Sequence, residues 1–466
     1  MTLPSLYDHQ EFMANFSLDH DIILNASSPG TGKTRGTLEG YVRRLRRGDN
    51  VGRLLVVCPL SIIKSSWADD IRRFTPLSYD IAHGTPQRRL AAFNSNAQVV
   101  LINHDGLKAL TTKKGKTTVL KWPTLFDGFT DLVIDEFTAF KHRTTQRSKA
   151  ALLVSSKFSH KTLLSGTPTA NTVLDIWHPA FILDGGERLG RRFFKFRSEV
   201  CNPEQTGPLP EHVKWVDKPG AEEAVVDALS DISIRFNFED VMDIPPNTLR
   251  FMYVDMPPKV ARAYKDMLEN KEVDTEDGRV SAINAAARAT KLLQILSGAV
   301  YDGNSISHGI HDERYDLVMQ LVDEREHSLV AFNWKHERNA LCAKAEKMGI
   351  SYACIDGSVP AKERPTIVEN YQKGLYKVLF CHPQSAAHGL TLTRGTTTIW
   401  ASPTYNPEHF KQFNQRIYRA GQTKSTETIC IATRDTREDE AYKALNDKMF
   451  RMDNLLALLT DQTKVK

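Results

Sequence analysis

A glycine-rich segment near the start of the chain has the residue types and spacing of a loop that binds phosphates. It reads SSPGTGKT, follows an apolar run at 22–26 and precedes a stretch with helical spacing. Glycines allow backbone N–H groups to face phosphate oxygens, and the positive end of the following helix adds attraction. In such a loop the lysine reaches the β- and γ-phosphates and the following hydroxyl holds Mg²⁺. The expected nucleotide-binding residues are Ser27, Ser28, Pro29, Gly30, Thr31, Gly32, Lys33 and Thr34.

Two adjacent carboxylates, Asp135 and Glu136, follow another apolar run 102 residues after Lys33. An aspartate at this place can hold Mg²⁺, and the adjacent glutamate can orient and deprotonate an attacking water. An isolated Asp-Glu pair at a strand end would usually be solvated. Its combination with the phosphate-binding loop favours hydrolysis of a nucleoside triphosphate.

Arg416 and Arg419 form an R-x-x-R pair far along the chain, followed by Ala-Gly-Gln. Phosphoryl transfer spreads negative charge over the γ-phosphate oxygens, and a guanidinium can neutralise that charge. The alternative for both arginines is a solvated helix face. If they act on the phosphates, they act from a different part of the chain than the loop, so catalysis requires the two parts to close.

Short, continuously apolar runs separated by helical segments indicate strands of parallel α/β sheets. They form two groups, which predict two α/β lobes with parallel sheets and helical insertions between them. We expect lobe 1 over 1–184, a linker and helical insertion over 185–300, and lobe 2 over 301–466. The runs lie at 22–26, 54–58, 99–102, 132–134 and 162–164, and then at 329–332, 352–355, 378–381, 398–400 and 428–432.

The region between the lobes differs in composition. Residues 201–220 contain four prolines, which is typical of a surface insertion or linker. Residues 257–268 and 280–296 have helical spacing, and so does the stretch 438–459 near the end.

Composition excludes several classes of protein. The 466 residues carry 61 Lys and Arg against 56 Asp and Glu, and 41% are hydrophobic, values near those of folded globular chains. No apolar run is long enough to span a membrane, so we expect no membrane partner and a cytoplasmic location. The six cysteines are scattered, which favours neither a disulfide framework nor a zinc ribbon. A net charge of +5 permits an anionic partner without requiring one.

In order along nearly the whole chain, these and further segments resemble a superfamily-two helicase or translocase of the Swi/Snf type. The motif from 382 to 393, HPQSAAHGLTLT, is similar to the bacteriophage and prophage branch. The segments that carry the resemblance are 7–10, 54–74, 135–142, 163–171, 234–267, 327–334, 355–374 and 382–424.

The resemblance implies two RecA-like lobes closing over one ATP, with Gln10 reading the adenine. It makes Arg419 the arginine finger and Arg416 its neighbour, and it has Thr34 and Asp135 hold magnesium. It implies a DNA-dependent ATPase that moves along double-stranded DNA, in phage replication, recombination or remodelling, within the host cytoplasm if phage-encoded. The DNA contacts implied by motif position are Ser61, Lys64, His104, Lys141, Asn333, Lys335 and Thr391.

Several positions depart from the family's pattern. Thr138 and Tyr418 each stand where the family has a histidine, Gln415 where it has an aspartate, and Thr391 where it has an asparagine. These changes affect the expected coupling to DNA rather than the catalytic charges. Two basic clusters are further candidates for DNA contact: 43–47, which is more typical of a solvated helix face, and 191–197, where Arg191, Arg192, Lys195 and Arg197 alternate with aromatic residues.

Two other functions remain open from sequence. One is a strand-separating helicase on single-stranded DNA or RNA, which would share every ATPase motif. The other is a nucleotide-gated DNA-binding scaffold without turnover, which would need neither the water-activating glutamate nor the arginine finger. Protein partners, oligomeric state and polarity along the strand have no signal in the sequence.

Overall fold

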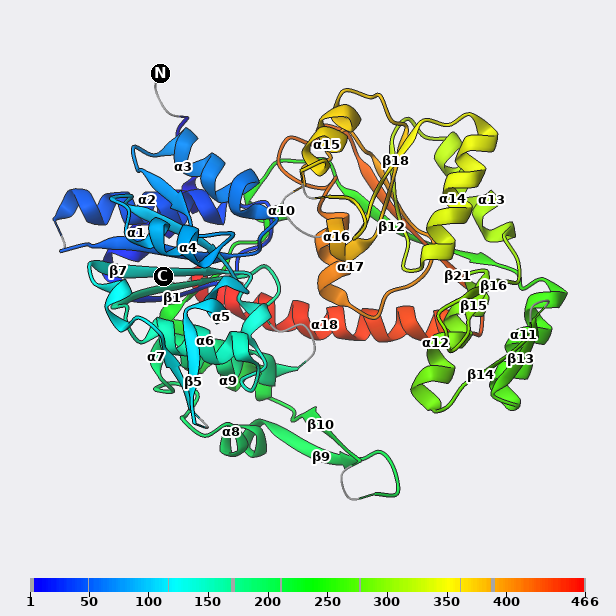
Figure 1. Cartoon of the computed structure of the whole chain (residues 1–466), viewed down its shortest axis with the longest axis horizontal. Helices are drawn as coiled ribbons and strands as arrows, with labels where there is room; N and C mark the ends of the chain where they lie inside the picture. The colour runs from blue at the N-terminus through cyan, green and yellow to red at the C-terminus, as the bar shows by residue number, and fades with distance from the viewer. Residues whose placement is uncertain are drawn as a thin grey trace. The chain divides into compact units, whose positions relative to one another are not determined.

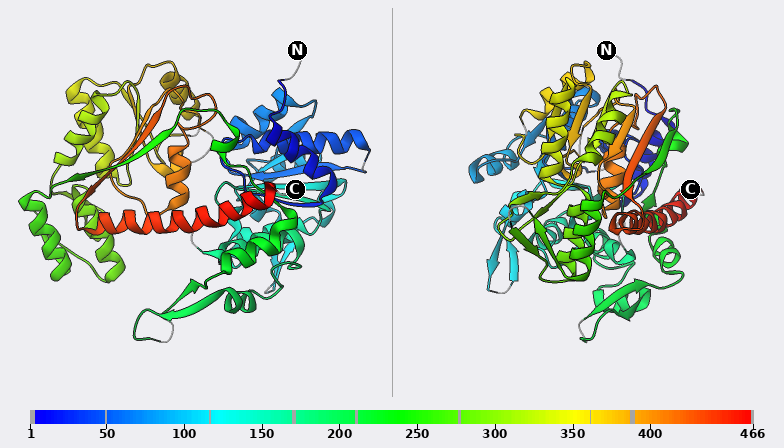
Figure 2. Two further views of the ribbon diagram at one scale, coloured as in Figure 1. Left: turned by 180° about the vertical axis from the view of Figure 1, so that it is seen from behind. Right: turned by 90° about the vertical axis from the view of Figure 1, so that its right-hand side faces the viewer.

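A computed structural model describes residues 4–48, 50–115, 117–168, 172–209, 212–275, 278–360, 362–386 and 390–464 (Figures 1 and 2). The chain forms two compact units: unit 1 comprises 1–243 and 449–466, and unit 2 comprises 244–448. The three-part division into 1–184, 185–300 and 301–466 stays a prediction, and the segment 185–300 is divided between the two units. Its first part packs into the core of unit 1, and the rest belongs to unit 2. Residues 169–171 and 387–389, within two of the quoted motifs, lie outside the described residues.

Unit 1 is built on a seven-stranded, fully parallel sheet in the order β11-β1-β8-β7-β2-β4-β3. Its central strands are apolar and buried because helices cover both faces, as expected for a parallel sheet. All five strands predicted in this lobe are present. The strands are β1 (Ile22–Asn25), β2 (Arg53–Cys58), β3 (Tyr79–Ile81), β4 (Val99–Asn103), β7 (Phe129–Asp135), β8 (His160–Leu164) and β11 (Ser233–Ile234).

Helices and two hairpins complete unit 1. The α-helices are α1 (Asp8–Asp19), α2 (Lys33–Arg47), α3 (Asp69–Phe74), α4 (Pro86–Phe93), α5 (Gly106–Ala109), α6 (Gln146–Ser155), α7 (Trp177–Asp184), α8 (Phe193–Val200), α9 (Ala221–Leu229) and α10 (Phe238–Val241). A π-helix, η1 (Ile63–Ala68), precedes α3, and short 3₁₀ turns are η2 (Pro123–Phe126), η3 (Phe137–Phe140), η4 (Val173–Ile176) and η5 (Ser230–Ile232). The hairpins pair β5 (Thr111–Lys114) with β6 (Thr117–Leu120), and β9 (Cys201–Gln205) with β10 (Val213–Asp217).

Unit 2 has a six-stranded parallel sheet in the order β12-β21-β20-β17-β19-β18. The five strands predicted in this lobe are present, and β12 adds an edge strand. The strands are β12 (Asn247–Val254), β17 (Ser328–Ala331), β18 (Tyr352–Ile355), β19 (Val378–Cys381), β20 (Thr397–Trp400) and β21 (Thr426–Thr433).

Seven helices and two small hairpins surround this second sheet within the described residues. The helices are α11 (Pro258–Glu269), α12 (Ala285–Leu296), α13 (Glu313–Asp323), α14 (Lys335–Met348), α15 (Arg364–Gln372), α16 (Pro383–Ala386) and α17 (Pro407–Asn414). The hairpins pair β13 (Glu272–Thr275) with β14 (Gly278–Ser281), and β15 (Ala299–Tyr301) with β16 (Ser307–Gly309).

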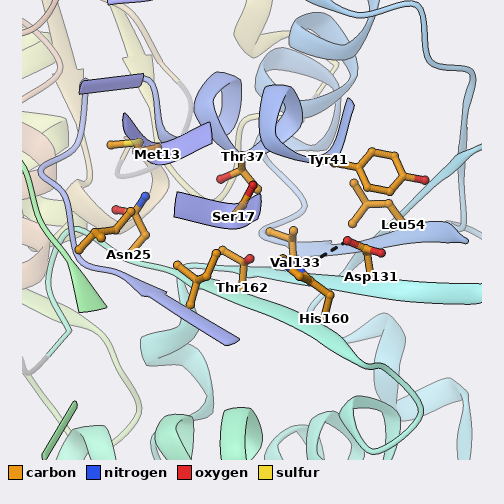
Figure 3. Close-up of a pocket in the computed structure, with 12 residues that line it drawn as sticks. Met13, Ser17, Asn25, Thr37, Tyr41, Leu54, Asp131, Val133, His160 and Thr162 are labelled. Carbon is orange, nitrogen blue, oxygen red and sulfur yellow. Dashed lines mark ion pairs between the residues drawn. The ribbon is translucent and has the colours of Figure 1, made fainter. Parts of the chain in front are cut away.

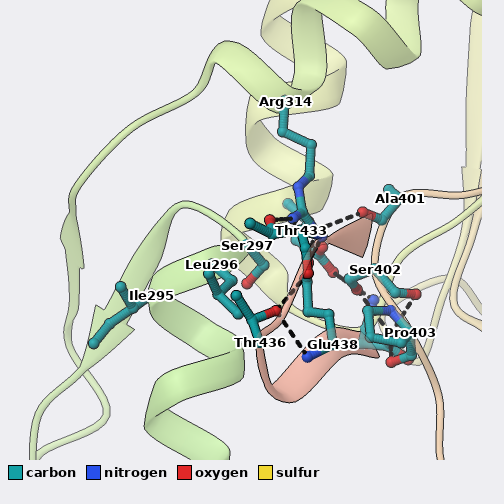
Figure 4. A network of polar contacts seen from close by, with 12 residues as sticks. Ile295, Leu296, Ser297, Arg314, Ala401, Ser402, Pro403, Thr433, Thr436 and Glu438 are labelled. Atoms are coloured by element: carbon teal, nitrogen blue, oxygen red, sulfur yellow. Dashed lines mark hydrogen bonds and ion pairs between the residues drawn. The ribbon is translucent and has the colours of Figure 1, made fainter. Parts of the chain in front are cut away.

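The long helix α18 (Arg437–Lys464), red in Figure 1, begins in unit 2 and ends in unit 1. Near its start, the buried Glu438 carboxylate accepts two hydrogen bonds of 2.6 Å from the Arg314 guanidinium (Figure 4). Its later part contributes buried side chains to the core of unit 1, namely Met452, Leu455, Leu456 and Leu459. Among the described helices, none combines the length and apolar character that a membrane span needs.

Candidate nucleotide-binding and catalytic site

The phosphate-binding loop joins the end of β1 to the start of α2, as the sequence predicted. Gly30 and Gly32 have φ angles of 89° and 75°, in the left-handed region that favours glycine. A Cβ on Gly32 would lie 2.2 Å from the Nε2 atom of Gln10. Gly32 is therefore required both for the backbone turn and for the close approach of α1.

The amine of Lys33 lies along this loop. Its Nζ donates to the carbonyl oxygens of Ser27 at 2.7 Å and Ser28 at 3.2 Å. Burial lowers the pKa of Lys33, and the nearby carboxylates of Glu136 and Asp135 oppose that shift. The loop carbonyls thus hold the lysine beside the place where phosphates would bind.

Gln10, the expected adenine-reading residue, lies on α1 against the same loop. Its Nε2 donates to the carbonyl of Thr31 at 3.3 Å, and the ring of His9 contacts that oxygen through Nε2 at 2.7 Å. Both side chains are buried. Residues 7–10 therefore brace the loop, and the contribution of His9 to this contact was not predicted.

The Asp-Glu pair lies where β7 ends, and β8 separates that strand from β1 in the sheet. The Asp135 carboxylate accepts from the Trp67 indole at 2.9 Å and from the Glu136 backbone N–H at 3.0 Å. Burial raises the pKa of Asp135, whereas the Trp67 hydrogen bond and the Lys33 charge lower it. Glu136 has a φ of 52°, in the left-handed region that a residue with a side chain rarely adopts, so the backbone is strained at this position.

The segment after β8 packs against both halves of the site. The Ser165 hydroxyl lies 3.5 Å from a Glu136 carboxylate oxygen. A Cβ on Gly166 would come within 2.5 Å of the Pro29 ring. The loop after β8 therefore lies against both the phosphate-binding loop and the Asp-Glu pair. Thr138, which replaces the family's histidine, is buried in η3 next to them.

Arg235 is a site residue that the sequence reasoning missed. Its guanidinium donates to the carbonyl of Ala26 at 2.5 Å and to the side chain of Asn237 at 2.7 Å, and the next residue's N–H donates to the Ser27 hydroxyl at 3.1 Å. Burial lowers the pKa of Arg235 to about 10. The segment 233–237 thus closes the phosphate-binding loop from a position over 200 residues away. Arg235 lies within the quoted segment 234–267, but a lone arginine there had no spacing signal of its own.

The predicted DNA contacts in unit 1 fall in different environments. Ser61 and Lys64 are exposed, the latter on η1. Lys141 is ion-paired with Asp175 at 3.1 Å. His104 is buried, and its Nε2 contacts the Asp135 carbonyl at 2.8 Å. The contact observed for His104 is therefore with the end of β7.

In unit 2, the two arginines of the R-x-x-R pair converge on one backbone oxygen. The carbonyl of Leu390 accepts from Arg416 at 3.2 Å and from Arg419 at 2.8 Å. Arg416 is buried and also donates to the Gln412 carbonyl, whereas Arg419 is partly exposed. The pair is thus held as one group in unit 2, while the phosphate-binding loop belongs to unit 1.

The remaining predicted DNA contacts also lie in unit 2. The amide of Asn333 donates to Ser402 and Pro403 within the protein, at 2.8 and 3.0 Å respectively. Lys335, at the start of α14, and Thr391 are exposed.

A pocket next to α2, the helix that follows the phosphate-binding loop, is lined by Asp131 and His160 among other residues (Figure 3). Asp131 on β7 forms an ion pair with Arg44 of α2. The ring of His160 on β8 faces the same carboxylate, with Nδ1 3.5 Å from its oxygen. Burial and the Arg44 charge lower the pKa of His160 to about 3, so this histidine is neutral at physiological pH.

Comparison with known proteins places these features in context. A family profile described as SNF2-related domain matches residues 11–299, and one described as helicase conserved C-terminal domain matches 313–422. Protein p41 of Acyrthosiphon pisum secondary endosymbiont phage 1 is 28% identical over 96% of this chain and 97% of its own. Chromodomain-helicase-DNA-binding protein 1-like of Mus musculus is 24% identical over 90% of this chain, which spans only 46% of that longer protein.

Other relatives share the same pattern of partial length. DNA annealing helicase and endonuclease ZRANB3 of Bos taurus is 25% identical over 85% of this chain and 36% of its own. Among solved structures, the Sulfolobus solfataricus SWI2/SNF2 ATPase core in complex with dsDNA is 20% identical, covers 99% of this chain and 95% of its own, and has a TM-score of 0.44.

Proposed function

The chain belongs to the SNF2-related helicase family, and it has a relative of similar length in a bacteriophage. We propose that it hydrolyses ATP to move along double-stranded DNA. As a member of the family it is a DNA-dependent ATPase of the helicase class. The proposal concerns what the hydrolysis drives and which residues perform it.

One observation carries the proposal: Lys33, Asp135 and Glu136 come together at the carboxyl ends of β1 and β7. Asn25 and Asp135, at the ends of these strands, pair with the same residue of the strand between them, Leu164. Ligands of parallel α/β sheets bind at this edge. The proximity of one lysine and two carboxylates is what hydrolysis of a magnesium-bound triphosphate needs.

The residues fit such a ligand. The left-handed glycines turn the loop so that its N–H groups and the amine of Lys33 can bind phosphates, while Thr34 and Asp135 would hold Mg²⁺. When bound, Mg²⁺ neutralises charge on the β- and γ-phosphates. Glu136 would take the proton of the attacking water, and Gln10 would contact the adenine.

Arg416 and Arg419 would supply positive charge at the γ-phosphate from unit 2. Because they are held as one group on the Leu390 carbonyl, they would enter the site together. Replacing Arg419 by Ala should lower kcat by about 10³-fold or more while the affinity of unit 1 for nucleotide stays unchanged. Unaltered turnover would place the arginine finger elsewhere.

The deciding experiment is steady-state ATP hydrolysis without nucleic acid and with blunt duplex DNA, single-stranded DNA or RNA, at two salt concentrations. Stimulation by duplex that weakens at higher salt supports the proposal, because phosphate contacts are salt-dependent. Preference for single strands or RNA would instead indicate a strand-separating helicase. Absence of hydrolysis in every condition would leave a nucleotide-gated binding scaffold.

A further inference from the structure

A cluster of stacked arginines and aromatic rings lies on unit 1 around α8. The Arg143 guanidinium lies 5.1 Å from the ring centres of both Phe193 and Phe194. The Arg197 guanidinium lies 5.0 Å from the Phe194 ring centre and 3.8 Å from that of Trp215 on β10. Residues more than 70 positions apart in the chain thus form one continuous stack.

Stacking of this kind can leave guanidinium N–H donors available to other partners, although the Nε atom of Arg197 is buried. A guanidinium that lies over a ring engages through its flat face, while its N–H donors point outward in the plane. Such a fixed, planar donor matches the oxygens of a phosphate.

Three further cations lie beside the stack and are exposed: Arg191, Arg192 and Lys195. Of these three cations and the two stacked arginines, only Lys195 has a carboxylate within 4 Å among the described residues, that of Glu199 at 3.7 Å, while the neighbouring Lys141 is paired with Asp175. We call Arg143, Arg191, Arg192, Lys195 and Arg197 with their rings the arginine-aromatic surface. Its excess positive charge fits a polyanion.

Each of the three rings has a guanidinium over it, although Phe194 is 61% exposed. Phe193 packs edge-on against Trp177 at 5.3 Å and against Phe194 at 5.7 Å, and guanidiniums lie over Phe193, Phe194 and Trp215. Proteins that bind single strands stack bases on open rings. Here the rings position cations, which favours contact with a phosphate backbone.

We propose that the arginine-aromatic surface binds the phosphate backbone of duplex DNA. The inference rests on the proposed function, since it adds a contact to the duplex on which the ATPase would act. Arg143 is in the same short segment as Lys141, two residues after that expected DNA contact, so the surface continues from the Asp-Glu loop toward α8. Four of its five cations are arginines, the residue that best matches phosphate geometry.

The test removes three exposed charges together: Arg191→Gln, Arg192→Gln and Lys195→Gln. None of these side chains lies in the ATP site. The matched control removes three exposed lysines elsewhere on unit 1: Lys113→Gln, Lys114→Gln and Lys157→Gln. Fluorescence anisotropy with a 30-base-pair duplex and a 30-nucleotide single strand, each at several salt concentrations between 50 and 200 mM, gives both affinity and its salt dependence.

We expect the first variant to bind duplex on the order of 10- to 100-fold more weakly at 0.1 M salt. The slope of log K against log salt concentration should be smaller in magnitude by about 2.7, which is about 0.9 for each of the three lost contacts. ATP hydrolysis without DNA should match the unmodified protein, which also shows that unit 1 is folded. The control should show a small change in both quantities.

The outcomes separate the two proposals. If the unmodified protein binds no duplex and is not stimulated by it, the proposed function fails. If it binds duplex but the two variants behave alike, the arginine-aromatic surface is not a DNA contact. A loss confined to the single strand would overturn the assignment to duplex backbone.

Discussion

Lys33 and Asp135 carry opposite charges when ionised, and burial disfavours the charged form of each residue. Burial lowers the pKa of the lysine and raises that of the aspartate, and their mutual attraction opposes both shifts. Perturbed groups of this kind cluster at functional sites. A bound triphosphate would add negative charge beside Lys33, and a bound Mg²⁺ would add positive charge beside Asp135. We therefore expect ligand binding to move the pKa of each residue back toward its ordinary value.

Replacing Glu136 by Gln should separate ATP binding from ATP hydrolysis. The amide keeps the shape of the side chain but cannot accept a proton from water, so kcat should fall by about 10²- to 10⁴-fold. Nucleotide affinity, measured by titration with a fluorescent ATP analogue, should change little. The exposed Glu187→Gln serves as control, and normal turnover in the Glu136 variant would remove this residue from the mechanism.

The buried His160 should make the stability of unit 1 depend on pH. Its pKa is about 3 in the folded protein against an ordinary value of 6.5, so below pH 6.5 the unfolded chain binds a proton that the folded chain does not. This contribution is complete above pH 6.5 and is lost as the pH falls. Between pH 7.5 and 5, the free energy of unfolding should drop by about 2 kcal/mol more in the unmodified protein than in His160→Gln. Urea titrations at both pH values measure this, and equal drops would contradict it.

Among the helices and strands, the π-helix η1 places the Trp67 side chain against Asp135 at the end of β7. Its extra residue per turn is a feature found often at functional sites. Trp67, near the end of η1, is fully buried and donates to the Asp135 carboxylate. The hydrogen bond fixes the orientation of that carboxylate before any metal binds.

Trp67→Phe should therefore weaken the response to magnesium more than it weakens the fold. A hydrogen bond to a charged group contributes about 1.5–3 kcal/mol, so the Mg²⁺ concentration for half-maximal turnover should rise about tenfold or more. Trp177→Phe is a matched control, since its indole is also buried and donates to the Gly190 carbonyl at 3.1 Å, in the other hydrophobic cluster of unit 1. Both variants should lose stability, but a shared shift in magnesium dependence would show that Trp67 has no special role.

Strands that carry a continuous apolar run could be predicted from the sequence, whereas strands that form mainly through contacts with distant segments could not. The apolar runs located β1, β2, β4, β7 and β8, because strands buried on both faces need continuous hydrophobicity. The edge strand β12 was not identified as a strand, since most of its side chains are half-buried or exposed. In the site, the loop and the Asp-Glu pair follow from residue types in fixed spacing. Arg235 has no such pattern, because its contact with Ala26 exists only after β11 pairs with β1.

For the whole molecule, the important feature is that unit 1 is discontinuous in sequence. It consists of 1–243 and the final part of α18, with all of unit 2 between them. That part of the helix places four apolar side chains in the unit 1 core, and Thr463 accepts from the Arg235 backbone N–H at 2.8 Å. The segment that closes the phosphate-binding loop is thus itself held by the end of α18.

Shortening side chains at the end of α18 should destabilise unit 1 selectively. Leu455→Ala and Leu459→Ala each remove a buried side chain and should cost about 2–5 kcal/mol. Hydrogen exchange of peptides from each unit should then show faster exchange in β1, β8 and β11, with little change in β17 and β19. Asn454→Ala, exposed on the same helix, is the control. Equal acceleration in both units would mean that they unfold together.

The interrupted layout of unit 1 has a consequence during synthesis on the ribosome. Residues 1–243 emerge first, but the side chains of α18 that cover part of their core come only after residue 448. At about 5–20 residues per second, the intervening roughly 205 residues take about 10–40 s to translate. For that interval the nascent first unit presents an uncovered apolar face, so chaperones that shield such surfaces should influence the yield of folded protein more than its final stability.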